Sequence, residues 1–233
     1  MKLKFKRIVL KISGEALGAS ANPIDFELVE RAASQIAQLQ KSGVEVGIVL
    51  GGGNIWRGRS SGDMERNRAD HMGMLATVIN SLAMQDALER LGAPCRLLSS
   101  VQMQRVCDTF SARAAQAALD EGKIAIFAGG SGSPFVTTDT AAALRAAEVH
   151  ADALFLAKNV DAVYSADPRV DANAVRYSRL SYDDVVQNNL KATDLTAITF
   201  CREQAIPIIL FSMHDEKSII SAAMGANVGT IID

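Results

Sequence analysis

The sequence has 233 residues, 48% of them hydrophobic, and its 24 Lys and Arg against 26 Asp and Glu give a net charge of −2. That length suits one α/β domain or two lobes that share a sheet, and the scattered charges exclude the basic stripe typical of a nucleic-acid-binding surface. Three cysteines without a C-x-x-C pair argue against a disulfide framework or a zinc site, and no apolar run reaches the ~20 residues that span a membrane, so we expect a soluble, cytoplasmic protein.

Short apolar runs alternate with amphipathic segments, which is the pattern of a mostly parallel sheet covered by helices. The predicted strands are residues 6–12, 44–50, 96–99, 124–128, 153–158 and 207–212. We find no internal repeat and no flexible linker. The sequence therefore predicts one α/β domain, residues 1–233, with a soft boundary near residue 150.

Helical spacing of apolar residues marks the segments between these strands. Residues 25–41 form the first predicted helix, with Asp25 as its N-cap and Gly43 as its stop. Its apolar face consists of Val29, Ala32, Ala33, Ile36 and Leu39. The second predicted helix, residues 71–91, places at helical spacing Leu75, Val78, Ile79, Leu82 and Leu91. Further helices are predicted at residues 111–121, 140–149, 194–204 and 215–224.

Three glycine-rich turns directly follow predicted strands, at residues 13–18, 51–54 and 129–134. Ligands of open parallel sheets bind beyond the carboxyl ends of the strands, so we expect the turns to line one crevice. Glycine lets backbone N–H groups approach an anion closely. One such turn is weak evidence, since it is often only a tight turn. Three favour a site for several phosphates, and a phosphotransferase must hold two phosphorylated groups side by side.

Other nucleotide and hydrolase motifs are absent from the sequence. No G-x-x-x-x-G-K-[ST] stretch occurs, and Trp56 stands where a G-x-G-x-x-G motif would need its third glycine. No G-x-S-x-G elbow is present. The three histidines lie on separate elements without H-x-x-H spacing, so we expect no metal held by the protein itself.

Several charged residues stand next to the glycine turns. Lys11 and Lys158 end predicted strands and Arg57 follows the second turn, where each cation suits a phosphoryl group, although each is also compatible with a solvated surface position. Asp70 suits two ribose hydroxyls or a simple helix N-cap. Tyr164 suits contact with a base. Asp167, which precedes Pro168, is as compatible with a turn as with a ligand.

Five segments of this sequence together resemble the bacterial UMP kinases of the amino-acid-kinase fold family. They are KISGEAL (11–17), GGGNIWRG (51–58), DHMGMLAT (70–77), GSPFVTTD (132–139) and VDAVYSADP (160–168). The first two belong to the wider fold family, whereas the third and fourth are more specific to UMP kinases. The resemblance covers nearly the whole chain.

The resemblance implies a three-layer αβα sandwich, assembled as a homohexamer. It implies ATP with Mg²⁺ as donor, UMP as acceptor, feedback inhibition by UTP, and a place in pyrimidine nucleotide biosynthesis. Residues of about 1–150 would form the UMP lobe and those of about 151–233 the ATP lobe.

The same resemblance assigns residues by motif position. ATP would contact Lys11, Ile12, Ser13, Gly14, Gly53, Arg57, Lys158, Asn159, Tyr164 and Asp167. UMP would contact Gly52, Asp70, Ser131, Gly132, Ser133, Pro134, Phe135, Val136, Thr137 and Thr138, with Asp70 on the ribose and Thr138 near uracil. The implied catalytic set is Lys11, Arg57, Asp139, Lys158 and Asp194, the two carboxylates orienting Lys11 and the metal.

A UMP phosphate is already anionic at neutral pH, because its second ionisation lies near pH ~6. Direct in-line transfer then needs no general base, and cations must offset the repulsion between the two phosphates. Two alternatives stay open: a kinase of a carboxylate or carbamate on the same fold, and a non-catalytic nucleotide-binding or storage protein.

Overall fold

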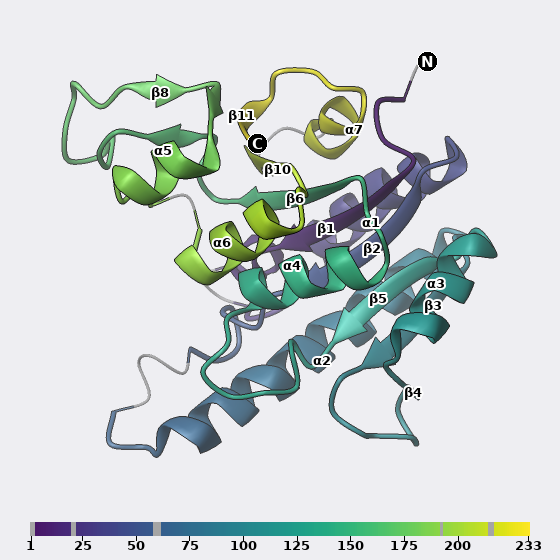
Figure 1. Cartoon of the computed structure of the whole chain (residues 1–233). Coiled ribbons are helices and arrows are strands. Elements are labelled where there is room, and N and C mark those ends of the chain that lie inside the picture. Colours follow the sequence, from purple (N-terminus) through teal and green to yellow (C-terminus); the bar gives the residue numbers. More distant parts are fainter. Residues whose placement is uncertain (1–2, 20–21, 58–61, 192, 214–216) are drawn as a thin grey trace.

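A nine-stranded, mostly parallel sheet forms the centre of the molecule (Figure 1). The structure, a computed structural model, describes residues 3–19, 22–57, 62–191, 193–213 and 217–233. The strands in sheet order are β4 (Asp108–Thr109), β3 (Cys95–Ser99), β5 (Ile124–Ala128), β2 (Glu45–Leu50), β1 (Arg7–Ile12), β6 (Ala153–Lys158), β10 (Ile208–Ser212), β11 (Gly229–Ile232) and β9 (Arg179–Leu180). Each pair of neighbouring strands in this sheet is parallel except β10 with β11.

Helices cover both faces of the sheet and make an αβα sandwich, which confirms the predicted fold class. One core layer contains buried side chains of α1 (Phe26–Lys41), α2 (Arg66–Arg90) and α7 (Ser218–Ala223). The other contains those of α3 (Ala112–Asp120), α4 (Thr138–Glu148), α5 (Tyr182–Gln187) and α6 (Leu195–Glu203). In Figure 1, α4 and α6 lie in front of the strands. A short 3₁₀ helix, η1 (Gly14–Leu17), and a hairpin of β7 (Val163–Tyr164) with β8 (Arg176–Tyr177) complete the described elements.

The six predicted strands are confirmed to within one residue at each end. The first predicted helix is also confirmed: Asp25 accepts hydrogen bonds from the N–H groups of Glu27 and Leu28, and Gly43 follows the helix with φ of 96°. Its predicted apolar face is buried in full. Unsatisfied N–H groups of a first turn favour such a cap, and glycine adopts positive φ without a Cβ clash.

The second helix departs from prediction in its start and in its faces. It begins at Arg66, so Asp70 lies inside the helix and is not its N-cap, which is Glu65. The first turn is polar and shows no apolar period, but the i,i+4 ion pair of Arg66 with Asp70 supports it. Leu75, Ile79, Leu82 and Leu91 are exposed, and of the predicted apolar set only Val78 is buried.

Other departures are smaller. Helix α4 starts at Thr138, two residues before the predicted start, because the hydroxyl of Thr137 caps the N–H of Thr140. The last predicted helix is observed as α7, although residues 214–216 lie outside the described part of the chain. All three cysteines are free thiols, in agreement with prediction.

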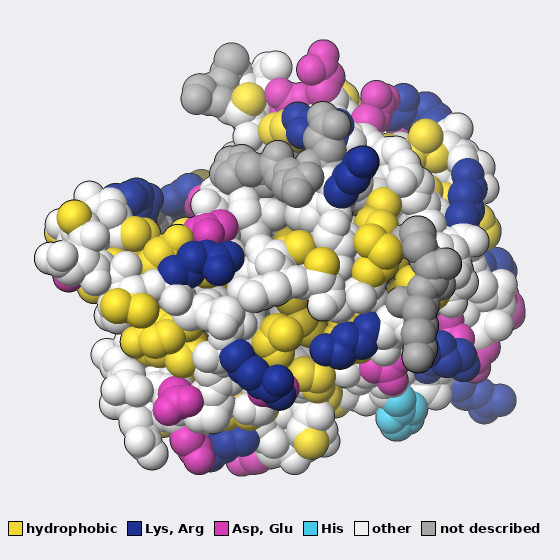
Figure 2. Space-filling view, turned by 90° about the horizontal axis from the view of Figure 1, so that it is seen from above, with side chains coloured by type: hydrophobic (Ala, Val, Ile, Leu, Met, Phe, Trp, Pro, Cys, Tyr) yellow, Lys and Arg dark blue, Asp and Glu magenta, His cyan; other side chains and the backbone are white. Residues whose placement is uncertain are grey.

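Figure 2, a view from above, shows Lys and Arg interspersed with Asp and Glu on that face. This agrees with the absence of a basic stripe from the sequence. Within the described residues, no helix combines the length and the apolar character needed to cross a membrane.

Candidate active site

The carboxyl ends of β1, β2, β5 and β6 lie along one edge of the sheet. Ile12 is level with Leu50 on one side and with Ala157 on the other, and the parallel β2–β5 register continues to Phe127. All three glycine-rich turns therefore leave the sheet at the same edge, as predicted. A Cβ on Gly14 would lie 2.7 Å from the Gly51 oxygen, so the first two turns touch through their backbones.

A buried carboxylate joins two of the predicted cations at this edge. The Asp139 Oδ1 atom lies 2.8 Å from Lys11 Nζ, and its Oδ2 lies 2.7 Å from Lys158 Nζ. Thr193 also donates a hydrogen bond of 2.5 Å to Oδ2. Burial by itself raises the pKa of Asp139, but the charges and hydrogen bonds of the two lysines outweigh burial and hold that pKa well below its usual range. Asp139 is therefore an anion that holds the two ammonium groups close together.

Asp194 has a different position from Asp139. It caps α6 through the N–H of Ala197 and accepts hydrogen bonds from the hydroxyls of Thr137 (2.5 Å) and Thr140 (2.7 Å) on α4. These partners are two hydroxyls and a backbone N–H. Asp139 therefore contacts Lys11 directly, as its predicted orienting role requires. Asp194 instead links the N-termini of α4 and α6.

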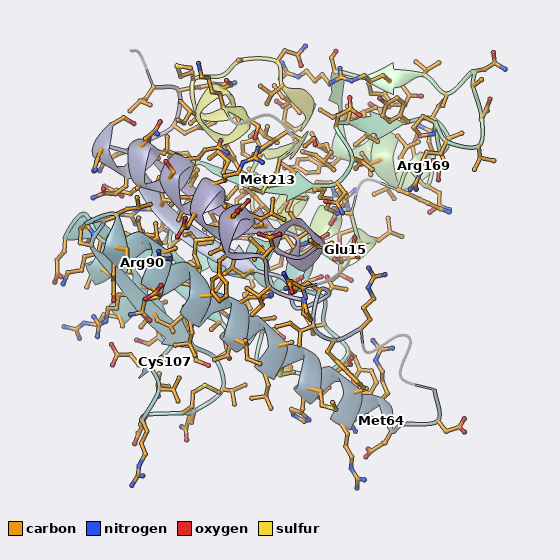
Figure 3. The ribbon with its side chains drawn as sticks, turned by 180° about the vertical axis from the view of Figure 1, so that it is seen from behind. Glu15, Met64, Arg90, Cys107, Arg169 and Met213 are labelled. Carbon is orange, nitrogen blue, oxygen red and sulfur yellow. The ribbon has the colours of Figure 1, made fainter. Side chains whose placement is uncertain are left out.

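Glu15, which no motif argument singled out, links two predicted ATP-binding residues. Its Oε1 lies 2.5 Å from Arg57 Nη2, and its Oε2 accepts a hydrogen bond of 3.1 Å from Asn159. Arg57 also donates to the Gly53 oxygen. Glu15 and Asn159 line, together with Met213, a hollow beside α1 that also reaches Lys158. Figure 3 labels Glu15 and Met213.

Next to the β7–β8 hairpin lies a cavity of about 450 Å³, here called the hairpin hollow. Its lining includes Tyr164, predicted to contact a base, and Asp167, predicted to contact ATP, with Ala162 and Leu190 as apolar surface. The Tyr164 hydroxyl donates to Asp161, and Asp167 pairs with Arg169. A largely apolar cavity with a few polar groups is typical of a small-molecule site.

Below α2 lies a smaller cavity of about 150 Å³, here called the α2 hollow. Among its lining residues are six of those predicted to bind UMP: Gly52, Asp70, Ser131, Ser133, Val136 and Thr138. Asp70 Oδ2 accepts hydrogen bonds from the Phe135 N–H and from Arg66. Phe135 has φ of 67°, the left-handed region that non-glycine residues seldom adopt, and Arg66 stacks on its ring.

A third, open cavity of about 490 Å³, the central hollow, borders the other two. It is lined by Lys11, Asp139 and Lys158. It shares Thr138 with the α2 hollow and shares Asn189, Leu190 and Lys191 with the hairpin hollow. The lysine pair thus lies between two sites, which is where charge develops when a phosphoryl group passes from one ligand to another.

The remaining predicted residues lie close to these cavities. Thr137 lines the central hollow. Ile12 ends β1, and Ser13 and Gly14 begin the first turn after it. Gly132 and Pro134 belong to the turn that carries Ser131 and Phe135. Four residues with contacts at this edge were given no role from the sequence. Glu15 and Thr77 lie inside two of the resembling segments, whereas Thr193 and Asn80 lie outside all five.

Comparisons with known proteins agree with this geometry. The sequence model of the amino acid kinase family matches residues 6–212. The curated uridylate kinase of Chelativorans sp. (strain BNC1) is 50% identical over 236 residues, which cover 100% of this chain and 96% of that protein. The crystal structure of UMP kinase from Ureaplasma parvum aligns with a TM-score of 0.94 at 38% identity, covering 99% and 100% of the two chains. That of UMP kinase from Bacillus anthracis aligns with a TM-score of 0.95 at 35% identity, covering 98% and 96%.

Proposed function

Because the chain belongs to the amino acid kinase family, and within it to the uridylate kinases, we propose that it transfers the terminal phosphoryl group of ATP to UMP, with ADP and UDP as products. The single structural observation that carries this proposal is the pair of lysines on Asp139, in a hollow that borders two further cavities. A buried cation pair between two ligand sites suits phosphoryl transfer, which depends on positioning and electrostatics.

ATP occupies the hairpin hollow and the turns beside it. Its base lies against Tyr164 and Asp167, and its phosphates extend into the central hollow. There they meet Lys11 and Lys158. The neighbouring turns supply the other contacts: Asn159, Arg57 and the backbone of Ile12, Ser13, Gly14 and Gly53, of which Gly53 also lines the α2 hollow. The support for this placement is that the hairpin hollow and the central hollow share three lining residues. Residues of about 151–233 would then supply most of the ATP side of the site, and residues of about 1–150 most of the UMP side.

UMP occupies the α2 hollow, with its ribose on Asp70 and its base along the segment of Ser131, Gly132, Ser133, Pro134, Phe135, Val136, Thr137 and Thr138. Gly52 has no space for a side chain: an added Cβ would lie 2.8 Å from the Gly73 oxygen. Asp70 already accepts an N–H from Phe135, so ribose hydroxyls would share or replace that bond. The UMP phosphate then points past Thr138, which lines both hollows, toward the lysine pair.

Transfer is direct and in line, with a phosphate oxygen of UMP as the nucleophile. That oxygen is anionic at neutral pH, and no histidine of the described residues lines the central hollow. Lys11 and Lys158 reduce the repulsion between donor and acceptor and stabilise the charge of the transferring group. Asp139 keeps the two ammonium groups in place, and Asp194 holds α4 and α6 together beside them.

We propose that Mg²⁺ enters with ATP, bound through the phosphates. Among the described residues, no three His, Cys, Asp or Glu side chains are grouped as metal ligands. Both oxygens of Asp139 are already engaged by lysines and Thr193. Phosphate oxygens therefore suit the ion better than any side chain of this site. The ion would neutralise phosphate charge, and the chain's own residues would position the nucleotides around it.

The exposed apolar face of α2 supports self-association. Met72, Leu75, Ile79 and Leu82 lie on one side of the helix, each between 39% and 50% exposed. A contiguous apolar helix face of this kind is typical of a protein interface. Its occupant is a second copy of this chain, in a homohexamer that is inhibited by UTP. The enzyme works in the cytoplasm, in pyrimidine nucleotide biosynthesis.

A coupled assay of ADP release tests this function. The purified protein with Mg-ATP is offered UMP, CMP, N-acetylglutamate or carbamate in turn, and UTP is added to the active mixture. ADP release that depends on UMP and falls on addition of UTP is expected. Preference for N-acetylglutamate or carbamate would identify a different acceptor, and nucleotide binding without ADP release would identify a binding protein.

A further inference from the structure

The buried face of α2 is partly polar near the glycine turns, which is unusual for a helix packed on a sheet. Thr77, Asn80 and Ser81 are at most 2% exposed, while the larger apolar side chains Leu75, Ile79 and Leu82 of the same segment are exposed. Asparagine and threonine are poor helix formers, and burying their polar groups costs free energy unless each finds a partner. The partners of these side chains therefore indicate what the polar face does.

Asn80 holds the second glycine turn. Its Nδ2 donates hydrogen bonds to the Gly51 oxygen (2.7 Å) and to Asn54 Oδ1 (2.8 Å). Asn54 returns a bond of 3.0 Å to Asn80 and donates to the Pro23 oxygen, just before α1. Two amides in a reciprocal pair fix the distance between α2 and the turn at residues 51–54.

Thr77, one turn earlier, holds the third glycine turn. Its hydroxyl accepts the Gly129 N–H at 2.9 Å and donates to the Met74 oxygen. Gly129 has φ of 74°, and an added Cβ would lie 3.1 Å from Ser99 Oγ, so this turn has little freedom to shift. The position of the first turn depends on that of the second, because Gly14 packs directly against Gly51, Gly53 and Asn54.

From these contacts we infer that Asn80 and Thr77 are positioning residues, which set the spacing of the three glycine turns and so align the two phosphorylated substrates. This inference rests on the proposed function, since it names what keeps its two nucleotide sites in register. Each nucleotide binds mainly through the turns it touches. Transfer needs the turns at a fixed separation, and a misplacement of ~1 Å can cost about 10²-fold in rate.

The test is the change Asn80→Asp, which keeps the shape and removes the amide donor to Gly51. We expect kcat to fall about 10- to 100-fold, with the KM values for ATP and UMP within about threefold of wild type. The introduced carboxyl regains a donor when it is protonated, so part of kcat should return as the pH is lowered. The matched control is Gln38→Glu. It makes the same amide-to-acid change at an exposed position of α1 and should leave kcat unchanged. Wild-type kcat in folded Asn80→Asp would overturn the inference.

A second pair of variants covers the case in which Asn80→Asp does not fold. Thr77→Val removes the bond to Gly129 at constant shape and should lower kcat, whereas Thr77→Ser should restore it. Thr199→Val is the control, since the Thr199 hydroxyl bonds only to carbonyls of its own helix. Equal kcat for Thr77→Val and Thr77→Ser would overturn the inference.

Hydrogen exchange separates this inference from the proposed function, because it needs no substrate. In Thr77→Val, amides of peptides that cover residues 124–134 should exchange faster than in wild type, while those of β1 and β6 stay protected. Unchanged exchange would refute the positioning role even if the enzyme phosphorylates UMP. Faster exchange would support it even if UMP is not the acceptor.

Discussion

Lys158, the last residue of β6, lies 2.7 Å from the carboxylate of Asp139, which stands in the first turn of α4. Lys11, the fifth residue of β1, approaches the other oxygen of the same carboxylate. The central sheet brings the two lysines together because β1 and β6 are neighbours with parallel register. A single buried anion thus holds two cations that would otherwise repel each other, at the place where phosphoryl charge must be stabilised.

The Lys11→Ala change should lower kcat by about 10²–10³-fold, because it removes a cation that acts on the transferring group. UMP affinity should change little, since Lys11 does not line the α2 hollow. Steady-state kinetics with both substrates measures the two effects. Lys6→Ala is the matched control. Lys6 immediately precedes the first residue of β1, pairs with Glu45 and is largely exposed. Wild-type turnover in Lys11→Ala would refute the role of this lysine.

Asp139→Asn should lower stability at neutral pH, because it leaves the two lysines without their anion. The lysines hold the pKa of Asp139 below the unfolded value of 3.8. A depressed pKa in the folded state stabilises the protein above the unfolded pKa, and this contribution is lost as the pH falls below it. Thermal unfolding at a series of pH values should therefore show a large Tm difference between variant and wild type at pH 7, which narrows below about pH 4. A difference that stays constant into acid would contradict the ion-pair account.

The Asp70→Asn change should raise the KM for UMP about 10- to 100-fold, the effect of weakening hydrogen bonds to a charged group. The KM for ATP should stay near its wild-type value, because Asp70 does not line the hairpin hollow. Asp86→Asn on the same helix is the control, because Asp86 is exposed and forms an ion pair with Arg90 at the surface. If both variants gave the wild-type KM for UMP, the α2 hollow would not be the acceptor site.

The sequence predicted the strands more accurately than the contacts between elements. Apolar runs and glycine turns are local signals, and they placed the residue ranges of β5 and β6 without error. That Lys11 and Lys158 lie at the same edge of the sheet was predictable, because ligand sites of parallel sheets lie beyond the carboxyl ends of the strands. The ion pairs with Asp139 depend on how α4 packs against β1 and β6, and no short-range pattern encodes that packing.

Helix α2 was the least predictable part of the candidate site. Helical spacing of Leu75, Ile79 and Leu82 normally marks a buried face, yet these residues are exposed and Asn80 is buried. A periodicity shows that a helix has an apolar side, but it does not show whether that side faces the sheet or another subunit. The short helix α5 was missed although Ser181 and Asp184 form a capping box, a signal that the sequence does contain.

On the proposal that the exposed apolar face of α2 joins copies of this chain, the Ile79→Glu change should give smaller species, because it places a charge in that face. Sedimentation velocity at several protein concentrations measures the size. Val170→Glu is the control, since Val170 is 86% exposed and lies far from α2 in the sequence. An unchanged sedimentation coefficient for Ile79→Glu would show that this face of α2 is not between subunits.

A crystal structure with UMP and a non-hydrolysable ATP analogue bound together is the most direct test of the central claim. Backbone amides and a few cations should gather both nucleotides at one edge of the sheet, with Lys11 and Lys158 beside the phosphates that would react. The account predicts UMP under α2, the analogue beside the β7–β8 hairpin, and their phosphates facing each other in the central hollow. Nucleotides bound at separate surfaces, or glycine turns that point away from the phosphates, would contradict it.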